Sequence, residues 1–180
     1  IRSDGMHIRR KFVRSVYEMV SVLVTSVITI MLIFTFLFRI AGVIGPSMQP
    51  TLFDGDKLVV SAINKKPVIG DIIIITQPNP FNEPLVKRII ALEGQTVDID
   101  FLKGVVTVDG KPESYGYGLT TDEFDVDFPL KVEKGCVFVL GDNRHHSTDS
   151  RSTTVGQIDV DYILGKVVFR FMPAGSWRVK

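Results

Sequence analysis

The hydrophobic and polar positions along the chain divide it into two unlike parts. Residues 19–38 form an apolar run without a single charge, whereas the rest of the chain alternates short apolar runs with turn-forming residues. At about 1.5 Å per residue, a helix of this length matches the ~30 Å hydrocarbon thickness of a bilayer. The pattern therefore predicts one membrane-spanning helix over residues 19–39.

Two alternatives fit the apolar run less well. A buried helix of a soluble protein would need a much larger domain around it. A cleaved signal peptide has a shorter apolar region followed by small residues, and the pair Arg39 and Ile40 is a poor cleavage site.

Basic residues flank the apolar run on its N-terminal side. Residues 1–18 contain four Arg and one Lys against one Asp and one Glu, whereas the chain after Arg39 is uncharged until Asp54. The positive-inside rule therefore predicts a cytoplasmic tail over residues 1–18 and an extracytoplasmic domain over residues 40–180. Whether residues 1–5, which precede Met6, belong to the natural chain is open.

Short runs rich in Val and Ile follow residue 40 and are separated by Gly, Pro, Asn and Asp. Such runs predict strands rather than helices. Asp109 and Gly110 give a strong hairpin-turn signal between two of them. We therefore expect a mostly β domain, either a small antiparallel β-barrel or two packed sheets. The expected strands lie within residues 57–63, 71–76, 85–94, 96–100, 104–112, 136–141 and 162–172.

Residues 113–131 interrupt the strand pattern and are expected to form a small variable insertion. Four acidic residues lie between Asp122 and Asp127. The cluster lacks the glycine turn of a helix–loop–helix calcium site, so a solvated loop is favoured.

The charge balance excludes one class of partner. Residues 40–180 carry 15 Lys and Arg against 18 Asp and Glu. This slightly acidic balance is opposite to that of a nucleic-acid-binding domain, so no nucleic-acid partner is expected. Cys136 is the only cysteine, so the chain can form no internal disulfide.

Ser47 is the first residue that could carry chemistry. It lies between Pro46 and Met48, with Gly45 and Pro50 nearby. Proline fixes φ and glycine permits unusual φ, so this segment can hold one hydroxyl and its backbone N–H in a set direction. A nucleophile needs such a setting, although an ordinary turn serine is the commoner occupant of a loop of this kind.

Lys87 is the second candidate. Strand alternation places Lys87 in one row with Leu85 and Ile89, while Arg88 points to the opposite face. Burial in such an apolar row would lower the lysine pKa. The alternative is an edge-strand lysine that discourages aggregation.

The third candidate is the polar loop, residues 141–151. Its alternating Ser147, Asp149 and Arg151 predict a hydrogen-bonding centre beside a site. His145 and His146 invite a metal-ligand or histidine-base interpretation, but adjacent histidines do not easily share one ion and no third ligand is spaced nearby. No metal and no organic cofactor are expected.

These segments together resemble bacterial type I signal peptidases, the membrane-bound serine proteases that remove signal peptides from exported proteins. The short tail, single span and small insertion are similar to the compact enzymes of Gram-positive bacteria. The motifs that carry the resemblance are GPSMQPTL from Gly45, GD from Gly55, GDIIII from Gly70, VKRIIALEG from Val86 and GDNRHHSTDSR from Gly141.

The resemblance implies a role for each matching residue. Ser47 would be the nucleophile, Lys87 the general base, and Ser147 the hydroxyl that orients the lysine. Gly45 stands where some members have a serine that helps to bind the oxyanion, so backbone N–H groups would form most of the oxyanion hole here. Structural support would come from Asp142, Asn143, Arg144, Asp149 and Arg151. Contact with substrate or membrane would come from Met48, Pro50 and Phe53.

The activity that the resemblance implies is cleavage of signal peptides at the outer face of the cell membrane, after small residues at the first and third positions before the cut. The expected partners are secretory preproteins and the lipid bilayer, and the oligomeric state is open. Two rival functions remain. One is a membrane-anchored β module that only binds partners. The other is a self-cleaving serine/lysine protease of the repressor type, which should carry a DNA-binding helical domain where this chain has its apolar run.

Overall fold

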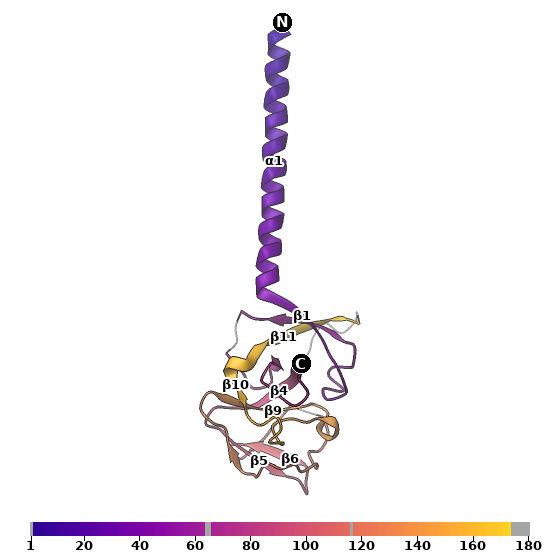
Figure 1. Cartoon of the computed structure of the whole chain (residues 1–180), viewed down its shortest axis with the longest axis vertical. Coiled ribbons are helices and arrows are strands. Elements are labelled where there is room, and N and C mark those ends of the chain that lie inside the picture. The colour runs from indigo at the N-terminus through magenta and orange to yellow at the C-terminus, as the bar shows by residue number, and fades with distance from the viewer. Residues whose placement is uncertain (1, 64–65, 116, 174–180) are drawn as a thin grey trace. The chain divides into compact units, whose positions relative to one another are not determined.

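The computed structural model describes residues 2–63, 66–115 and 117–173, with side chains from Phe12 onward. The chain divides into two compact units, Ile1–Leu37 and Phe38–Lys180. The first unit is one helix and the second is a β domain (Figure 1). The basic side chains of residues 2–11, which contribute to the topology prediction, lie outside the described side chains.

Helix α1, Arg2–Leu37, contains an apolar stretch, Phe12–Leu37, with a mean hydropathy of 2.5. No part of that stretch is buried within the protein, and its 26 residues suffice to cross a bilayer. Four of its hydroxyl groups donate to backbone carbonyls of the preceding turn, which satisfies them without water. They belong to Thr25, Ser26, Thr29 and Thr35.

The apolar run predicted as helix up to residue 39 changes conformation two residues earlier. Phe38 and Arg39 belong to strand β1, Phe38–Gly42, and lie opposite Ser61 and Val60. The predicted boundary is therefore wrong by two residues. Hydropathy does not distinguish an apolar helix end from an apolar strand start, because only the pairing with the next strand does so.

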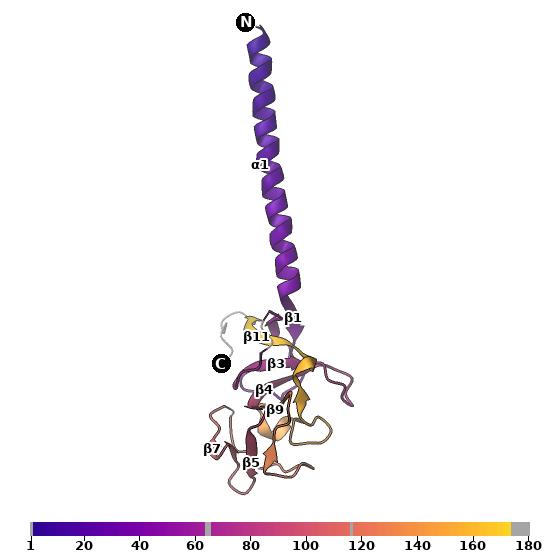
Figure 2. The same cartoon turned by 90° about the vertical axis from the view of Figure 1, so that its left-hand side faces the viewer.

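Two antiparallel sheets form the β domain, in agreement with the predicted fold class. The seven-stranded sheet has the order β1-β2-β11-β3-β4-β9-β10, and Figure 2 shows β1, β11, β3, β4 and β9 in succession across the domain. Besides β1, its strands are β2 (Lys57–Ser61), β11 (Ile163–Met172), β3 (Ile72–Ile75), β4 (Leu85–Leu92), β9 (Cys136–Leu140) and β10 (Ile158–Asp159).

The four-stranded sheet has the order β7-β6-β5-β8 and lies at one end of the β domain (Figure 1). Its strands are β5 (Thr96–Asp100), β6 (Val105–Val108), β7 (Lys111–Pro112) and β8 (Leu130–Lys131). Asp109 and Gly110 both have positive φ and join β6 to β7 by a two-residue turn, as their sequence predicts. Two short 3₁₀ helices, Arg144–His146 and Val160–Tyr162, complete the fold.

Strand β3 shows why the chain folds this way. Ile73 and Ile75 pack in one core cluster with β4, β9 and β11, whereas Ile72 and Ile74 pack in another with β2 and the segment after β1. An unbroken isoleucine run without polar alternation fits a strand that is buried on both faces. This packing fixes β3 and its neighbour β4 at the centre of the sheet.

Candidate active site

Ser47 lies in the serine loop, residues 45–52, which follows β1. Gly45 begins this loop with φ of 83°, a conformation that favours glycine because it has no Cβ. The Gly45 N–H donates to Asp54 Oδ1 at 2.9 Å. Gly45 has no side-chain donor, and its backbone donor is already engaged, so it is poorly placed to stabilise an oxyanion.

Met48 anchors the serine loop in the core. Its side chain is fully buried, and Leu52 N donates to Met48 O at 2.9 Å. The prediction that Met48 contacts substrate or membrane is therefore wrong for its side chain, because this apolar group packs inward and holds the loop. Pro50 and Phe53 are exposed, and their contact with substrate or membrane stays a prediction.

Lys87 projects from β4, an interior strand between β3 and β9. The edge-strand interpretation of this lysine is therefore excluded. Lys87 is only 3% exposed. Burial lowers the pKa of Lys87 to about 8, while the nearby Asp149 carboxylate raises it and Arg151 lowers it by smaller amounts. A lysine with this pKa has a useful neutral fraction near neutral pH and can accept a proton.

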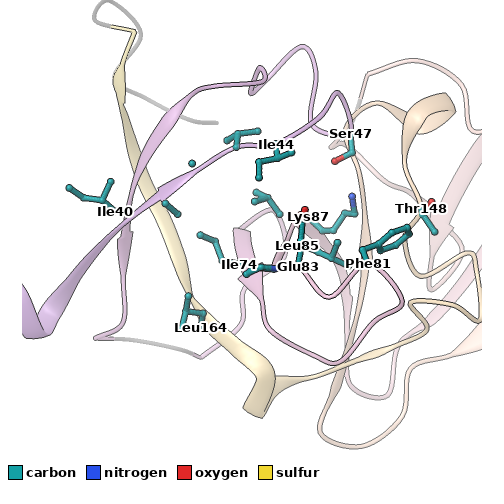
Figure 3. A pocket seen from close by; sticks show the side chains of 15 residues that line it. Ile40, Ile44, Ser47, Ile74, Phe81, Glu83, Leu85, Lys87, Thr148 and Leu164 are labelled. Atoms are coloured by element: carbon teal, nitrogen blue, oxygen red, sulfur yellow. The ribbon is translucent and has the colours of Figure 1, made fainter.

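Ser47 and Lys87 line the same pocket, which has a volume of about 600 Å³. The Lys87 side chain extends toward Ser47 in Figure 3. Aliphatic side chains line most of the remaining wall, and Ile40 and Leu164 lie at the end away from Ser47. The pocket is thus an apolar groove with a hydroxyl and an amino group at one end, an arrangement that suits attack on an apolar acyl group.

Three polar or aromatic residues of the pocket wall are missing from the sequence-based prediction. Thr148 lies beside Ser147 in the polar loop, and Phe81 and Glu83 come from the connection between β3 and β4. Thr148 lies between Ser147 and Asp149, so it is not one of the alternating residues on which the prediction for this loop rests. Phe81 and Glu83 lie in a Pro- and Asn-rich stretch with no periodicity, so no sequence signal marks them.

The polar loop is organised by buried charges. Asp149 and Arg151 are completely buried and form an ion pair, with Arg151 Nε donating to Asp149 Oδ1 at 2.8 Å. The Gly141 N–H donates to Asp149 Oδ2 at 3.0 Å. Arg144 is buried as well, and its Nε donates to Gly141 O at 3.1 Å. These contacts form the hydrogen-bonding centre that the alternating polar residues predict.

Ser147 is buried beside the pocket, and its Oγ has no hydrogen-bond partner among the described residues. A buried hydroxyl without a partner is costly, and such groups in native proteins often have a functional reason. The structure does not join Ser147 Oγ to Lys87 by a hydrogen bond. The role of Ser147 in orienting the lysine therefore stays a prediction.

Two contacts tie the polar loop to the catalytic candidates. Arg88, the neighbour of Lys87, forms a nearly fully buried two-pronged pair with Asp142, at 2.7 Å from Nε and 2.6 Å from Nη2. Asn143 donates its N–H to Ser47 O at 3.0 Å. The start of the polar loop is thus fixed to β4 on one side and to the serine loop on the other.

His145 and His146 lie outside the pocket wall. Both are exposed, and their Nδ1 atoms lie 3.0 Å from Asp122 Oδ1 and 3.3 Å from Asn143 Oδ1 respectively. The pocket wall that contains Ser47 includes Lys87 and neither histidine. The geometry therefore favours lysine over histidine as the base.

A β domain with a turn-held serine and a buried lysine in one apolar groove defines a candidate serine hydrolase. Comparison with known proteins identifies the family. The model of the family described as signal peptidase, peptidase S26, matches residues 16–172. The chain belongs to this family, which confirms the resemblance drawn from the motifs.

The chain is similar to named members along most of its length. It is 36% identical over 180 residues to signal peptidase I of Bacillus licheniformis, covering 91% of this chain and 92% of that one. It is 34% identical over 170 residues to the probable signal peptidase I-1 of Synechocystis sp., covering 89% and 84%. A crystal structure of a signal peptidase I from Enterococcus faecalis V583 is 30% identical with a TM-score of 0.44, covering 56% of this chain and 96% of that one.

Proposed function

We propose that the chain is a membrane-anchored signal peptidase I that uses Ser47 as nucleophile and Lys87 as general base. The main observation behind this proposal is that Ser47 and a buried lysine with a pKa of about 8 line the same pocket. The family membership and the named relatives support the same activity. Its substrates are exported preproteins, and its product is a preprotein without its signal peptide.

The reaction follows from the positions of the two groups. Neutral Lys87 takes the Ser47 hydroxyl proton while Ser47 Oγ attacks the carbonyl carbon of the last signal-peptide residue. Backbone N–H groups, including that of Ser47, stabilise the oxyanion. Protonated Lys87 then gives its proton to the leaving amine, and the peptide bond breaks to leave an ester on Ser47. Water activated by Lys87 hydrolyses this ester and restores the enzyme.

The apolar pocket supports a preference for small apolar residues before the cut. Five aliphatic side chains line the groove; four come from strands β1, β3, β4 and β11, and the fifth precedes the serine loop. They are Ile40, Ile74, Leu85, Leu164 and Ile44. These bulky groups leave room for small side chains and offer few polar partners to large polar ones. By family resemblance, we assign small residues to the first and third positions before the cut.

Membrane topology forms part of the same proposal. The apolar stretch Phe12–Leu37 anchors the chain, and the basic residues before it place the N-terminus in the cytoplasm. The β domain then lies outside the cytoplasm. Protease added outside intact cells should digest the β domain and spare the tail, and protection of the β domain would contradict this orientation.

The decisive experiment measures the mass of the products formed from a preprotein by the detergent-solubilised full chain. Wild type should release a mature protein with one defined N-terminus, and Ser47→Ala should release none. Ser114→Ala is the matched control, because Ser114 is exposed and does not line the pocket, and it should keep full activity. Cleavage by Ser47→Ala at the wild-type rate would overturn the assignment.

A further inference from the structure

The insertion contacts the polar loop through a buried arginine. The Arg144 side chain is about 3% exposed, and its guanidinium group makes hydrogen bonds to both segments. Nη2 donates to a carboxylate and a carbonyl of the insertion, Nη1 donates to a hydroxyl there, and Nε donates to the polar loop. The acceptors are Glu113 Oε1 at 2.5 Å, Tyr115 O at 2.6 Å, Thr120 Oγ1 at 2.8 Å and Gly141 O at 3.1 Å.

A second buried arginine repeats this connection. Arg151 Nη1 donates to Asp122 O at 3.3 Å, and its guanidinium carbon lies 4.9 Å from the centre of the Phe124 ring. Cation–π contacts at this distance are attractive, and more so away from water. The contacting segment, residues 113–125 with Gly116 left aside, is named the loop brace here. Both of its arginine partners belong to the polar loop.

The same two arginines hold the part of the polar loop that faces the nucleophile. Arg151 Nη2 donates to Arg144 O at 2.7 Å and to Ser147 O at 3.2 Å. Arg144 in turn holds Gly141 O. A Cβ placed on Gly141 would lie 2.5 Å from Ser147 Cβ and 2.6 Å from Ser47 O. Gly141 therefore packs directly between the Ser147 side chain and the Ser47 carbonyl. A shift of the Gly141 backbone would change the position of Ser147 relative to Ser47.

Glu113 offsets the free-energy cost of burying the Arg144 guanidinium group. A buried guanidinium without a paired charge is strongly disfavoured, whereas a short charge-assisted hydrogen bond to a carboxylate compensates for its lost hydration. Among the described residues, Glu113 is the one carboxylate that forms an ion pair with Arg144. Loss of the Glu113 charge would favour movement of Arg144 toward water and release of its bond to Gly141 O.

We infer that Glu113 and Thr120 are positioning residues for the reaction, because they hold Arg144 and through it the register of Gly141 and Ser147 against Ser47. This inference rests on the proposed function. It also gives the insertion a purpose that its irregular sequence does not reveal. The loop brace sets the geometry of the polar loop without touching substrate.

Matched variants test this inference by steady-state kinetics on a preprotein. Glu113→Gln and Thr120→Val should each lower kcat by about 10-fold or more, since misplacement of about 1 Å can cost 10²-fold, with KM changed by less than about twofold. Thr120→Ser restores the hydroxyl and should recover most of kcat. Glu123→Gln is the control, because Glu123 is exposed on the same segment, and it should match wild type.

Hydrogen exchange at the Gly141 and Asn143 amides supplies a readout that does not depend on activity. These amides donate to Asp149 and Ser47, so Glu113→Gln should speed their exchange while amides of β3 keep their protection. Equal kcat and exchange in Glu113→Gln and Glu123→Gln would overturn the inference. So would a loss of kcat that Thr120→Ser fails to recover or that matches a loss of folded protein. If wild type cleaves no preprotein, the proposed function fails, and the exchange data still decide whether the loop brace holds the polar loop.

Discussion

The pH dependence of cleavage should report the depressed pKa of Lys87. Burial lowers this pKa from 10.5 to about 8, and only the neutral amine can accept the Ser47 proton. At pH 7 the neutral fraction is about 9% for a pKa of 8 but about 0.03% for a pKa of 10.5. Burial therefore raises the concentration of active base about 300-fold at pH 7. The lower pKa also makes the neutral Lys87 amine a weaker base, but general-base catalysis is most efficient when the pKa of the base lies near the working pH.

The assay is kcat/KM for one preprotein between pH 6 and pH 11 in a constant-ionic-strength buffer series. From pH 7 to pH 9 the neutral fraction rises about 10-fold and then levels off, so kcat/KM should follow the same curve with a midpoint near 8. Because kcat/KM reports groups of the free enzyme, a second preprotein should give the same midpoint. Lys87→Arg should be inactive throughout, since guanidinium remains protonated.

Asp149→Asn tests the cause of the shift and its sign. The Asp149 carboxylate raises the pKa of Lys87, so its neutralisation should move the midpoint to lower pH in the fraction of enzyme that stays folded. A profile that climbs about tenfold per pH unit all the way from pH 7 to about pH 10 would refute the depressed lysine pKa, because an unperturbed lysine gives that profile. A midpoint that moves upward in Asp149→Asn would refute the electrostatic reasoning even if the wild-type curve fits.

Three further outcomes follow from the same contacts. Gly141→Ala should lower kcat/KM by about 10²-fold or more while the protein stays folded, because the added methyl group forces Ser147 and Ser47 apart; wild-type kcat/KM would contradict the close packing. Replacement of both His145 and His146 by Asn should leave kcat/KM within about threefold of wild type and the pH midpoint unchanged, since a lost general base costs about 10²-fold or more. Lys87→Met should stabilise the fold at pH 7 by on the order of 3 kcal/mol, because Lys87 is still mostly protonated there and burial disfavours its charged form, and this gain should disappear as pH rises from 8 to 10.5. Thermal unfolding of both proteins at pH 7 and pH 10.5 measures that difference.

Local pattern was sufficient to predict most of the fold. The isoleucine run at β3 and the apolar row around Lys87 are local patterns that result from burial. They can be recognised in the sequence without knowing which strands pair with β3 and β4. The sequence does not predict strands β1, β8 and β10. Strands β8 and β10 contain only two residues each, and β1 continues the apolar run of α1. Such strands exist through pairing, as when Phe38 meets Ser61, and pairing leaves no periodic trace.

At the candidate site, some residues can be predicted from the sequence and others can be identified only from the structure. Ser47 and Lys87 stand out because their immediate neighbours are unusual for their residue types, while Met48 was misassigned because an exposed and a buried methionine look alike in a turn. Glu113 gave no signal, since its role depends on a cation 31 residues away in the chain. A buried arginine must find an anion wherever the chain can supply one, and a loop without regular structure is free to do so. Irregular insertions that contact a catalytic loop are therefore places where distant charge pairs can determine activity.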